Sequence, residues 1–228
     1  MKKQLIFLGA PGSGKGTQAS KLAEFLKIPH IDTGSILRSA VGEGTELGNT
    51  AKSYMDAGKL VPSEIVIGII KERLQKSDCE NGFILDGFPR NIEQAKGLDV
   101  ILTEINKEIT IVINIDIPED ILVDRMAYRR ICKVCGEKYN LKFFPPKNDE
   151  KCDKCGNELM QRSDDSRENA VRRIETYKNE TEPLIQYYND RKVLKNIDGN
   201  RNIENIFEDI KNIDKKCQKC HCKRSDAS

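Results

Sequence analysis

Short apolar runs alternate with amphipathic helical patterns along most of this chain. The helical patterns place apolar residues on one stripe, as Ala19, Leu22 and Leu26 do within residues 15–26. The apolar runs are short enough to be buried strands, and they cover residues 5–8, 28–31, 83–85, 109–115 and 193–197. Strands that alternate with helices predict an α/β fold, in which a parallel sheet carries helices on both faces.

Two segments interrupt this alternation. Residues 33–60 are rich in small and polar side chains and lack a strand pattern, which predicts a short helical insertion. Residues 128–165 hold four cysteines, a Pro-Pro pair and many lysines. The polar end of the chain is predicted to be disordered. We therefore expect a core of residues 1–31, 62–127 and 166–214, insertions at 32–61 and 128–165, and a tail at 215–228.

Composition narrows the function classes. The 38 basic and 36 acidic residues leave a formal charge of +2, so the overall charge does not favour a nucleic acid partner. No run is long enough for a signal sequence or a membrane span, and we expect a cytoplasmic protein without a membrane partner. In that compartment the eight cysteines are better explained as metal ligands or free thiols than as a disulfide framework.

A glycine-rich segment after the first apolar run carries specific chemistry. Residues 9–17 read Gly-Ala-Pro-Gly-Ser-Gly-Lys-Gly-Thr, which matches the P-loop pattern G-x-x-x-x-G-K. Glycines let successive backbone N–H groups point inward, and a helix that opens at Lys15 adds the positive end of its dipole. Such a cradle binds the phosphates of a nucleoside triphosphate. Gly16 stands where Ser or Thr usually follows the lysine, and Thr17 comes one place later.

Four cysteines of the second insertion have the spacing of a metal site. Two C-x-x-C pairs, Cys132 with Cys135 and Cys152 with Cys155, are separated by sixteen residues. Four thiolates form a closed tetrahedral site that suits structural Zn²⁺ and leaves no position open for catalysis. Iron, or an apo or disulfide-bonded form, is the alternative. Neighbouring lysines are expected to offset the negative charge of the thiolates, namely Lys133, Lys138, Lys151 and Lys154.

A further group of cysteines lies in the tail, as Cys217-Gln-Lys-Cys220-His221-Cys222. It contains the C-x-x-C-H spacing of c-type haem attachment. Haem attachment requires an exported protein and a pocket for the porphyrin, so we reject that interpretation for a polar tail. A second metal site and a disordered thiol-rich tail stay open as alternatives. Cys79, near the end of a predicted helix, is interpreted as a structural cysteine.

Arginines recur in or beside the predicted loops. Phosphoryl transfer spreads negative charge over the equatorial oxygens of the transferred group, so its catalysts supply fixed cations and Mg²⁺. Asp86 ends a buried strand, where its carboxylate would face the phosphates and hold Mg²⁺ through water. The Phe88-Pro89 peptide that follows is a candidate for the cis form. The arginines that fit this chemistry are Arg38, Arg90, Arg129, Arg162 and Arg173.

These motifs, taken in order, resemble the adenylate kinase family, in its long form with a zinc-bearing lid. The resemblance covers roughly residues 3 to 214, and Gly16-Thr17 after the lysine is one of its more specific marks. It implies a P-loop NTPase fold with a five-stranded parallel sheet, an AMP-binding flap at 32–61 and a lid at 128–165, both of which close over the substrates. It also implies Mg²⁺-dependent transfer from ATP to AMP to give two ADP, by a monomer.

The resemblance also implies roles for individual residues. Around the transferring phosphoryl group it places Lys15, Arg38, Arg90, Arg129, Arg162 and Arg173. On the ATP side it places Gly12, Ser13, Gly14, Lys15, Gly16, Thr17, Arg129, Lys138, Tyr139 and the backbone at Arg201. On the AMP side it places Thr33, Arg38, Lys59, Leu60, Val61, Gly87, Phe88, Pro89, Arg90, Gln94, Arg162 and Arg173. Asp164 and Asp165 would latch the closed lid by pairing with arginines.

One departure concerns the AMP side. The family commonly carries an acidic residue after Thr33-Gly34, whereas this chain has Ser35, so the resemblance does not extend to the local order around Arg38.

Two other functions compete with this interpretation. The first is a kinase that uses UMP or CMP as acceptor or GTP as donor. Gln94 favours adenine over uracil, because its amide both donates and accepts hydrogen bonds. The second is a zinc-ribbon module that binds nucleic acid, and it explains only residues 128–165.

Overall fold

A five-stranded parallel sheet forms the centre of the protein, with the strand order β2-β3-β1-β4-β8. The computed structural model describes residues 3–148 and 150–225, with side chains as far as Asp214. Each strand overlaps one of the expected apolar runs, which confirms the predicted α/β fold. The strands are β1 (Lys3–Leu8), β2 (His30–Asp32), β3 (Gly82–Asp86), β4 (Ile111–Asp116) and β8 (Leu194–Asp198).

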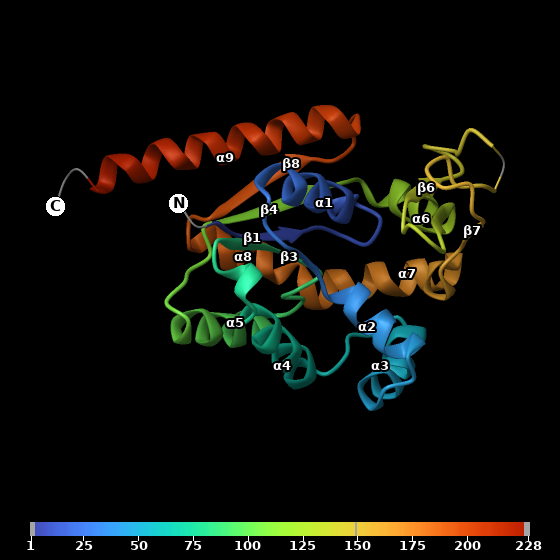
Figure 1. Ribbon diagram of the computed structural model, residues 1–228, viewed down its shortest axis with the longest axis horizontal. Coiled ribbons are helices and arrows are strands. Elements are labelled where there is room, and N and C mark those ends of the chain that lie inside the picture. Colours follow the sequence, from blue (N-terminus) through green and yellow to red (C-terminus); the bar gives the residue numbers. More distant parts are fainter. Residues whose placement is uncertain (1–2, 149, 226–228) are drawn as a thin grey trace.

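Helices cover both faces of the sheet (Figure 1). Because strand side chains alternate between faces, Leu5 and Phe7 of β1 pack in one apolar cluster, and Ile6 and Leu8 pack in another. The first cluster also contains residues of α1 (Lys15–Leu26) and α9 (Ile203–Ser225). The second contains residues of α4 (Ser63–Leu74), α5 (Ile92–Glu104) and α8 (Pro183–Asp190).

The remaining core segments connect these layers. A 3₁₀ turn, η1 (Ser77–Cys79), precedes β3, and α6 (Glu119–Ala127) follows β4. Helix α7 (Arg167–Thr176) continues through a π-helical turn, η3 (Tyr177–Thr181), into α8. Residues of α6 and α7 form a third apolar cluster that contains Met126 and Ile174.

Two extensions rise beyond the carboxyl ends of the strands (Figure 1). The first follows β2 and consists of α2 (Thr33–Gly42) and α3 (Glu46–Asp56). The second follows α6 and contains an antiparallel three-stranded sheet in the order β6-β5-β7. Its strands are β5 (Arg129–Cys132), β6 (Lys138–Asn140) and β7 (Leu159–Met160), and a 3₁₀ turn, η2 (Ser163–Asp165), leads into α7.

The end of the chain differs from the expectation of a disordered tail. Helix α9 continues to Ser225, and residues 203–225 contain no proline or glycine that would interrupt it. The side chains of the Cys217–Cys222 group lie outside the described residues, as do residues 226–228. Within the described ranges, no helix is both long and apolar enough to cross a membrane.

Candidate functional site

The glycine-rich loop lies between β1 and α1, as its position in the sequence predicts. Gly12 and Gly14 have φ angles of 88° and 87°, which are left-handed values that favour glycine. Inside the loop, Ser13 N donates to Ala10 O at 3.1 Å, and Thr17 N donates to Gly14 O at 3.0 Å. The loop thus ends at the amino terminus of a twelve-residue helix, where unpaired N–H groups and the helix dipole attract anions.

Gly16 lies where two charged side chains approach the loop. A Cβ atom at this position would be 2.9 Å from Asp86 Oδ2 and 3.4 Å from Lys138 Nζ. A serine or threonine, which the general P-loop pattern has here, would have to displace the carboxylate. The absence of a side chain at Gly16 therefore leaves room for Asp86 and for a lysine from β6.

Asp86 is the last residue of β3 and is buried beside the loop. Its Oδ2 atom lies 3.3 Å from Nε2 of His30. Its Oδ1 atom is buried and has no hydrogen-bond partner among the described residues. A buried carboxylate oxygen next to a phosphate cradle fits a water ligand of Mg²⁺, because Mg²⁺ usually retains several waters.

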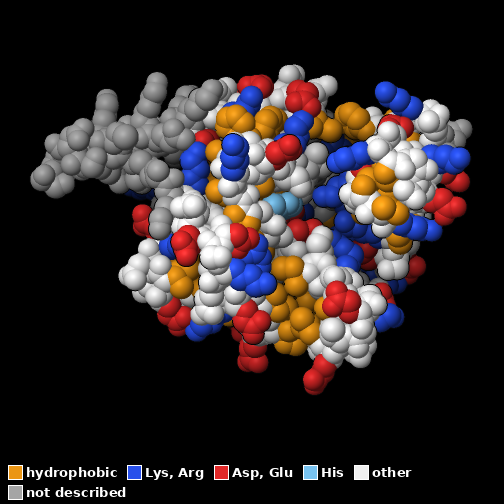
Figure 2. Space-filling model, in the orientation of Figure 1, with side chains coloured by type: hydrophobic (Ala, Val, Ile, Leu, Met, Phe, Trp, Pro, Cys, Tyr) orange, Lys and Arg blue, Asp and Glu red, His pale blue; other side chains and the backbone are white. Residues whose placement is uncertain are grey.

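Several cations crowd around the loop. Burial lowers the pKa of Lys15 to about 8; Asp86 opposes this shift, whereas Arg90, Arg173 and Arg129 add to it. Burial and the neighbouring Arg129 and Arg38 likewise lower the pKa of Arg162 to about 10. Figure 2 shows Lys and Arg side chains gathered beside the hollow between the second extension and the rest of the protein. Such a cluster attracts a polyanion.

Two aspartates from η2 pair with these arginines. Arg129 Nε donates to Asp165 Oδ2 at 2.7 Å, and Arg129 Nη2 contacts the other oxygen of the same carboxylate. Arg173 Nη1 lies 3.0 Å from Asp164 Oδ2 and 3.0 Å from Asp165 Oδ1. Asp165 is fully buried. The two carboxylates therefore hold Arg129, at the base of β5, against Arg173 of α7.

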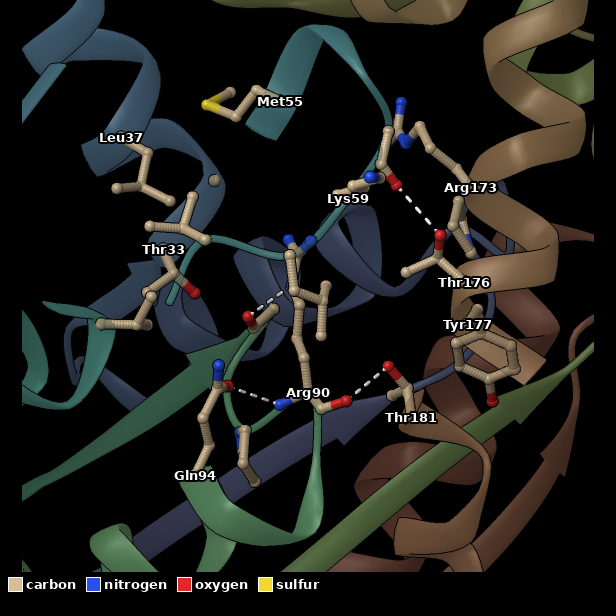
Figure 3. A pocket seen from close by; sticks show the side chains of 18 of the residues that line it. Thr33, Leu37, Met55, Lys59, Arg90, Gln94, Arg173, Thr176, Tyr177 and Thr181 are labelled. Carbon is tan, nitrogen blue, oxygen red and sulfur yellow. Dashed lines mark hydrogen bonds between the residues drawn. The ribbon is translucent and has the colours of Figure 1, made fainter. Parts of the chain in front are cut away.

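A pocket beside the loop collects most of the residues expected on the acceptor side (Figure 3). Gln94 Oε1 accepts a hydrogen bond of 2.8 Å from Arg90 N, which leaves the amide NH₂ to donate. The Phe88-Pro89 peptide is cis, as the sequence indicated. The expected residues that line the pocket are Lys15, Thr33, Arg38, Lys59, Leu60, Val61, Gly87, Pro89, Arg90, Gln94 and Arg173.

The pocket also contains residues that sequence reasoning missed. Thr181 Oγ1 donates to Arg90 O at 2.7 Å, and Thr176 Oγ1 donates to Gly58 O at 3.1 Å. Both threonines belong to α7 and its π-helical turn, which no motif marks in the sequence. They tie this segment to the Arg90 loop and to the end of the first extension.

The four cysteines of the second extension come together as their spacing predicts. Their sulfur atoms all lie within 4.8 Å of one another, and Cys132 Sγ lies 3.4 Å from Cys155 Sγ. Four sulfurs at the tetrahedral Zn–S distance would be about 3.8 Å apart, so the donor set fits a Zn²⁺ ion. All four are free cysteines rather than disulfides.

The three residues expected on the ATP side outside the glycine-rich loop and Arg129 have different surroundings in the structure. Tyr139 directs its hydroxyl to Cys152 Sγ, at 3.5 Å, and therefore faces the cysteines. Lys138, which we expected both on the ATP side and beside the thiolates, reaches the glycine-rich loop. The Arg201 side chain pairs with Asp209 Oδ2 at 2.6 Å, so it turns along α9.

Comparisons with known proteins agree with this geometry. The family model described as adenylate kinase matches residues 7–193. An adenylate kinase of Archaeoglobus fulgidus is 56% identical over 209 residues, which cover 92% of this chain and 96% of that protein. An adenylate kinase of Caldanaerobacter subterraneus subsp. tengcongensis is 53% identical over 208 residues, or 91% and 94% of the two chains. One of Methanosarcina acetivorans is 52% identical over 209 residues, or 92% and 97%.

Proposed function

We propose roles for the site residues on the premise that this chain belongs to the adenylate kinase family. The protein is accordingly a phosphotransferase that converts ATP and AMP reversibly into two ADP. Adenylate kinases use ATP together with Mg²⁺. The observation that supports our assignment most directly is the position of the cations: Lys15, Arg90 and Arg173 line the acceptor pocket and also surround the glycine-rich loop.

The donor triphosphate is proposed to lie on the loop. Backbone N–H groups of residues 12–17 would bind its phosphates, and Lys15 would place a cation on the β- and γ-phosphates. Lys138 approaches the same loop from β6 and adds a second positive charge. When Mg²⁺ is bound, it neutralises developing phosphate charge, and Asp86 would hold it through water. We assign no contact with the nucleotide to the side chain of Arg201.

The acceptor AMP is proposed to occupy the pocket of Figure 3. Its phosphate would meet Arg38 from the first extension and Arg90 and Arg173 from the core. The base would lie toward Gln94, whose free NH₂ can donate to a ring nitrogen of adenine. Phosphoryl transfer would then proceed between two groups of cations that stabilise the charge of the transition state.

Both extensions are proposed to close over the substrates and exclude water. Lys138 and Arg129 come from the second extension, and Arg38 comes from the first. If either extension opened, these cations would leave the phosphates, and water could compete as acceptor. We propose zinc as the ion of the four-cysteine site, where it would keep the second extension rigid. A monomeric state, a cytoplasmic location and the absence of nucleic acid and membrane partners stay predictions.

A coupled assay with ATP and each of AMP, UMP, CMP and GMP tests the acceptor assignment. AMP is expected to be the fastest acceptor by at least an order of magnitude, because only a matched base edge satisfies Gln94. Faster turnover of UMP than of AMP would overturn the assignment. The variant Gln94→Leu should lower the ratio of AMP turnover to turnover of the other three acceptors, because leucine has a similar size and no hydrogen-bonding group.

A further inference from the structure

Asp32 is the last residue of β2 and directly precedes helix α2, yet its side chain does not cap that helix. An aspartate in this position usually accepts a hydrogen bond from a backbone N–H of the first helical turn. Among the residues that the structure describes, no N–H of this turn donates to it. Its Oδ2 atom instead accepts a hydrogen bond of 2.5 Å from the Ser35 hydroxyl. The Asp32 carboxylate is therefore hydrogen-bonded by a side chain of α2 rather than by its backbone.

Arg38 completes a chain of contacts with the same two residues. Its Nη2 atom donates to Ser35 Oγ at 3.1 Å and lies 3.5 Å from Asp32 Oδ2. Ser35 and Arg38 are three residues apart in α2, so they share one side of the helix. Ser35 thus bridges the pair, because its hydroxyl donates to the carboxylate and accepts from the guanidinium group.

Gly34 gives these side chains the space to meet. A Cβ atom at Gly34 would lie 3.0 Å from Arg38 Nη1 and 3.2 Å from Asp32 Oδ1. Any larger residue would push the guanidinium group or the carboxylate away from its present place. The backbone of the turn therefore allows the arginine to lie across it, beside the aspartate.

The surroundings of Asp32 favour the ionised form of its carboxyl group. Burial raises the pKa of this carboxyl, but the Ser35 hydrogen bond and the charges of Arg38 and Lys138 outweigh that effect and lower the pKa to about 2. The group is consequently ionised at neutral pH and offers Arg38 a fixed negative partner. Arg38 also lines the acceptor pocket, so its orientation matters there.

We propose that Asp32 is a positioning residue that holds Arg38, through Ser35, in the orientation that meets the phosphate of AMP. It would supply from position 32 the carboxylate that the family commonly carries at position 35. This inference rests on the proposed role of Arg38 as an AMP ligand. Asp32 also attracts Arg38 away from the phosphate, but its contact at 3.5 Å is long, and several other cations remain to attract the phosphate. Orientation of a flexible arginine is therefore the larger effect.

The experiment measures steady-state kinetics of the full chain and four variants. Asp32→Asn removes the charge and keeps the size of the side chain. The double variant Asp32→Asn with Ser35→Asp returns a carboxylate three residues later. Arg38→Gln tests the role of the arginine itself. Asp56→Asn is the matched control, because Asp56 lies in the same extension and, within the part of the chain that the structure describes, forms an ion pair only with exposed Lys52.

Asp32→Asn is expected to raise KM for AMP about five- to tenfold, with kcat within about twofold and KM for ATP and Tm unchanged. The double variant should return KM for AMP to within about twofold of the original value. The control should leave it unchanged. A loss of Tm without a selective change in KM for AMP would show a merely structural role and overturn the inference.

The remaining outcomes separate the inference from the proposed function. If Arg38→Gln raises KM for AMP but Asp32→Asn leaves it unchanged or lowers it, the inference is wrong and the role of Arg38 stands. If Arg38→Gln has no effect on KM for AMP, the proposed role of Arg38 itself is wrong. If Asp32→Asn fails to fold, the double variant still decides, because a tenfold higher KM for AMP there contradicts the interchange of the two carboxylates.

Discussion

The hydroxyl of Thr181 donates a hydrogen bond of 2.7 Å to the backbone carbonyl of Arg90, a residue 91 positions earlier in the chain. This bond fixes the Arg90 loop against the π-helical turn between α7 and α8. π-helical turns often occur at functional sites, and this one borders the pocket proposed for AMP.

Thr181→Val should therefore weaken both stability and AMP binding. Valine has nearly the same shape but cannot donate, so the Arg90 carbonyl would lose its partner at a cost of about 1–3 kcal/mol in the free energy of unfolding. We expect a lower denaturant midpoint together with a raised KM for AMP. Thr181→Ser keeps the donor and serves as the control. Equal behaviour of the valine and serine variants would contradict this role.

Lys15→Ala and Arg90→Ala should each lower kcat by about two orders of magnitude or more. Each variant removes a cation that would stabilise the negative charge developing on the transferred phosphoryl group. The melting temperature should change little. Burial already disfavours the charged form of Lys15, so the loss of its ammonium group removes an unfavourable interaction as well as favourable ones. Turnover near the original rate in either variant would remove that residue from the catalytic site.

The lowered pKa of Lys15 predicts a pH dependence of nucleotide binding. Phosphate favours the charged lysine, so the pKa in the complex lies above the value of about 8 in the free protein. Below pH 8 the lysine is protonated in both states, and binding takes up no proton at this group. Above pH 8, binding must take up a proton, and affinity falls as pH rises toward the pKa of the complex.

Calorimetry at pH 8.5 in buffers of different ionisation enthalpy measures this proton uptake. Lys15→Arg stays charged across the window and should show less uptake than the original chain. An identical uptake in the two proteins would assign the titration to another group.

Removal of the metal should reduce stability before it affects the glycine-rich loop. The small second extension has little apolar core of its own, so four ligands to one ion would replace the missing packing. Cys152→Ser, or treatment with a chelator, is expected to lower the melting temperature. Cys79→Ser is the matched control, since Cys79 is buried far from the cluster in sequence and beside Arg73. Protein purified without added zinc and found free of metal would refute the structural-zinc assignment.

Local sequence signals predicted the features that depend on neighbouring residues. The glycine-rich loop, the five strands and the pairs of cysteines each arise from short stretches with a strong pattern. Lys138 shows that closeness in sequence does not decide which group a side chain faces. Its closeness to Cys135 in sequence suggested a place beside the thiolates, whereas the family resemblance placed both Lys138 and Tyr139 on the ATP side. Neighbouring residues of a strand point to opposite faces, so the two side chains cannot share one surrounding. Tyr139 consequently faces the cysteines, and Lys138 faces the loop.

Contacts between distant segments could not be predicted in the same way. The bonds of Thr181 to Arg90 and of Thr176 to Gly58 depend on how α7 and its π-helical turn lie against two loops. No motif records that arrangement. The link between Asp32 and Arg38 spans only six residues, yet it depends on the Asp32 carboxylate accepting from Ser35 rather than from a backbone N–H of α2. Capping preference alone predicts that the Asp32 side chain accepts from the first turn of α2, a bond that it does not make although it stands at the N-cap position.

The crowding of cations around Lys15 also has a consequence for the lifetime of the protein. Like charges held together oppose folding, and a bound nucleotide supplies the counter-charge that offsets their repulsion. A ligand that binds only the folded chain adds about 2.7 kcal/mol of stability at a hundred times its Kd. Proteases act on the unfolded fraction, so each copy of the protein should survive longer where its own substrates are plentiful.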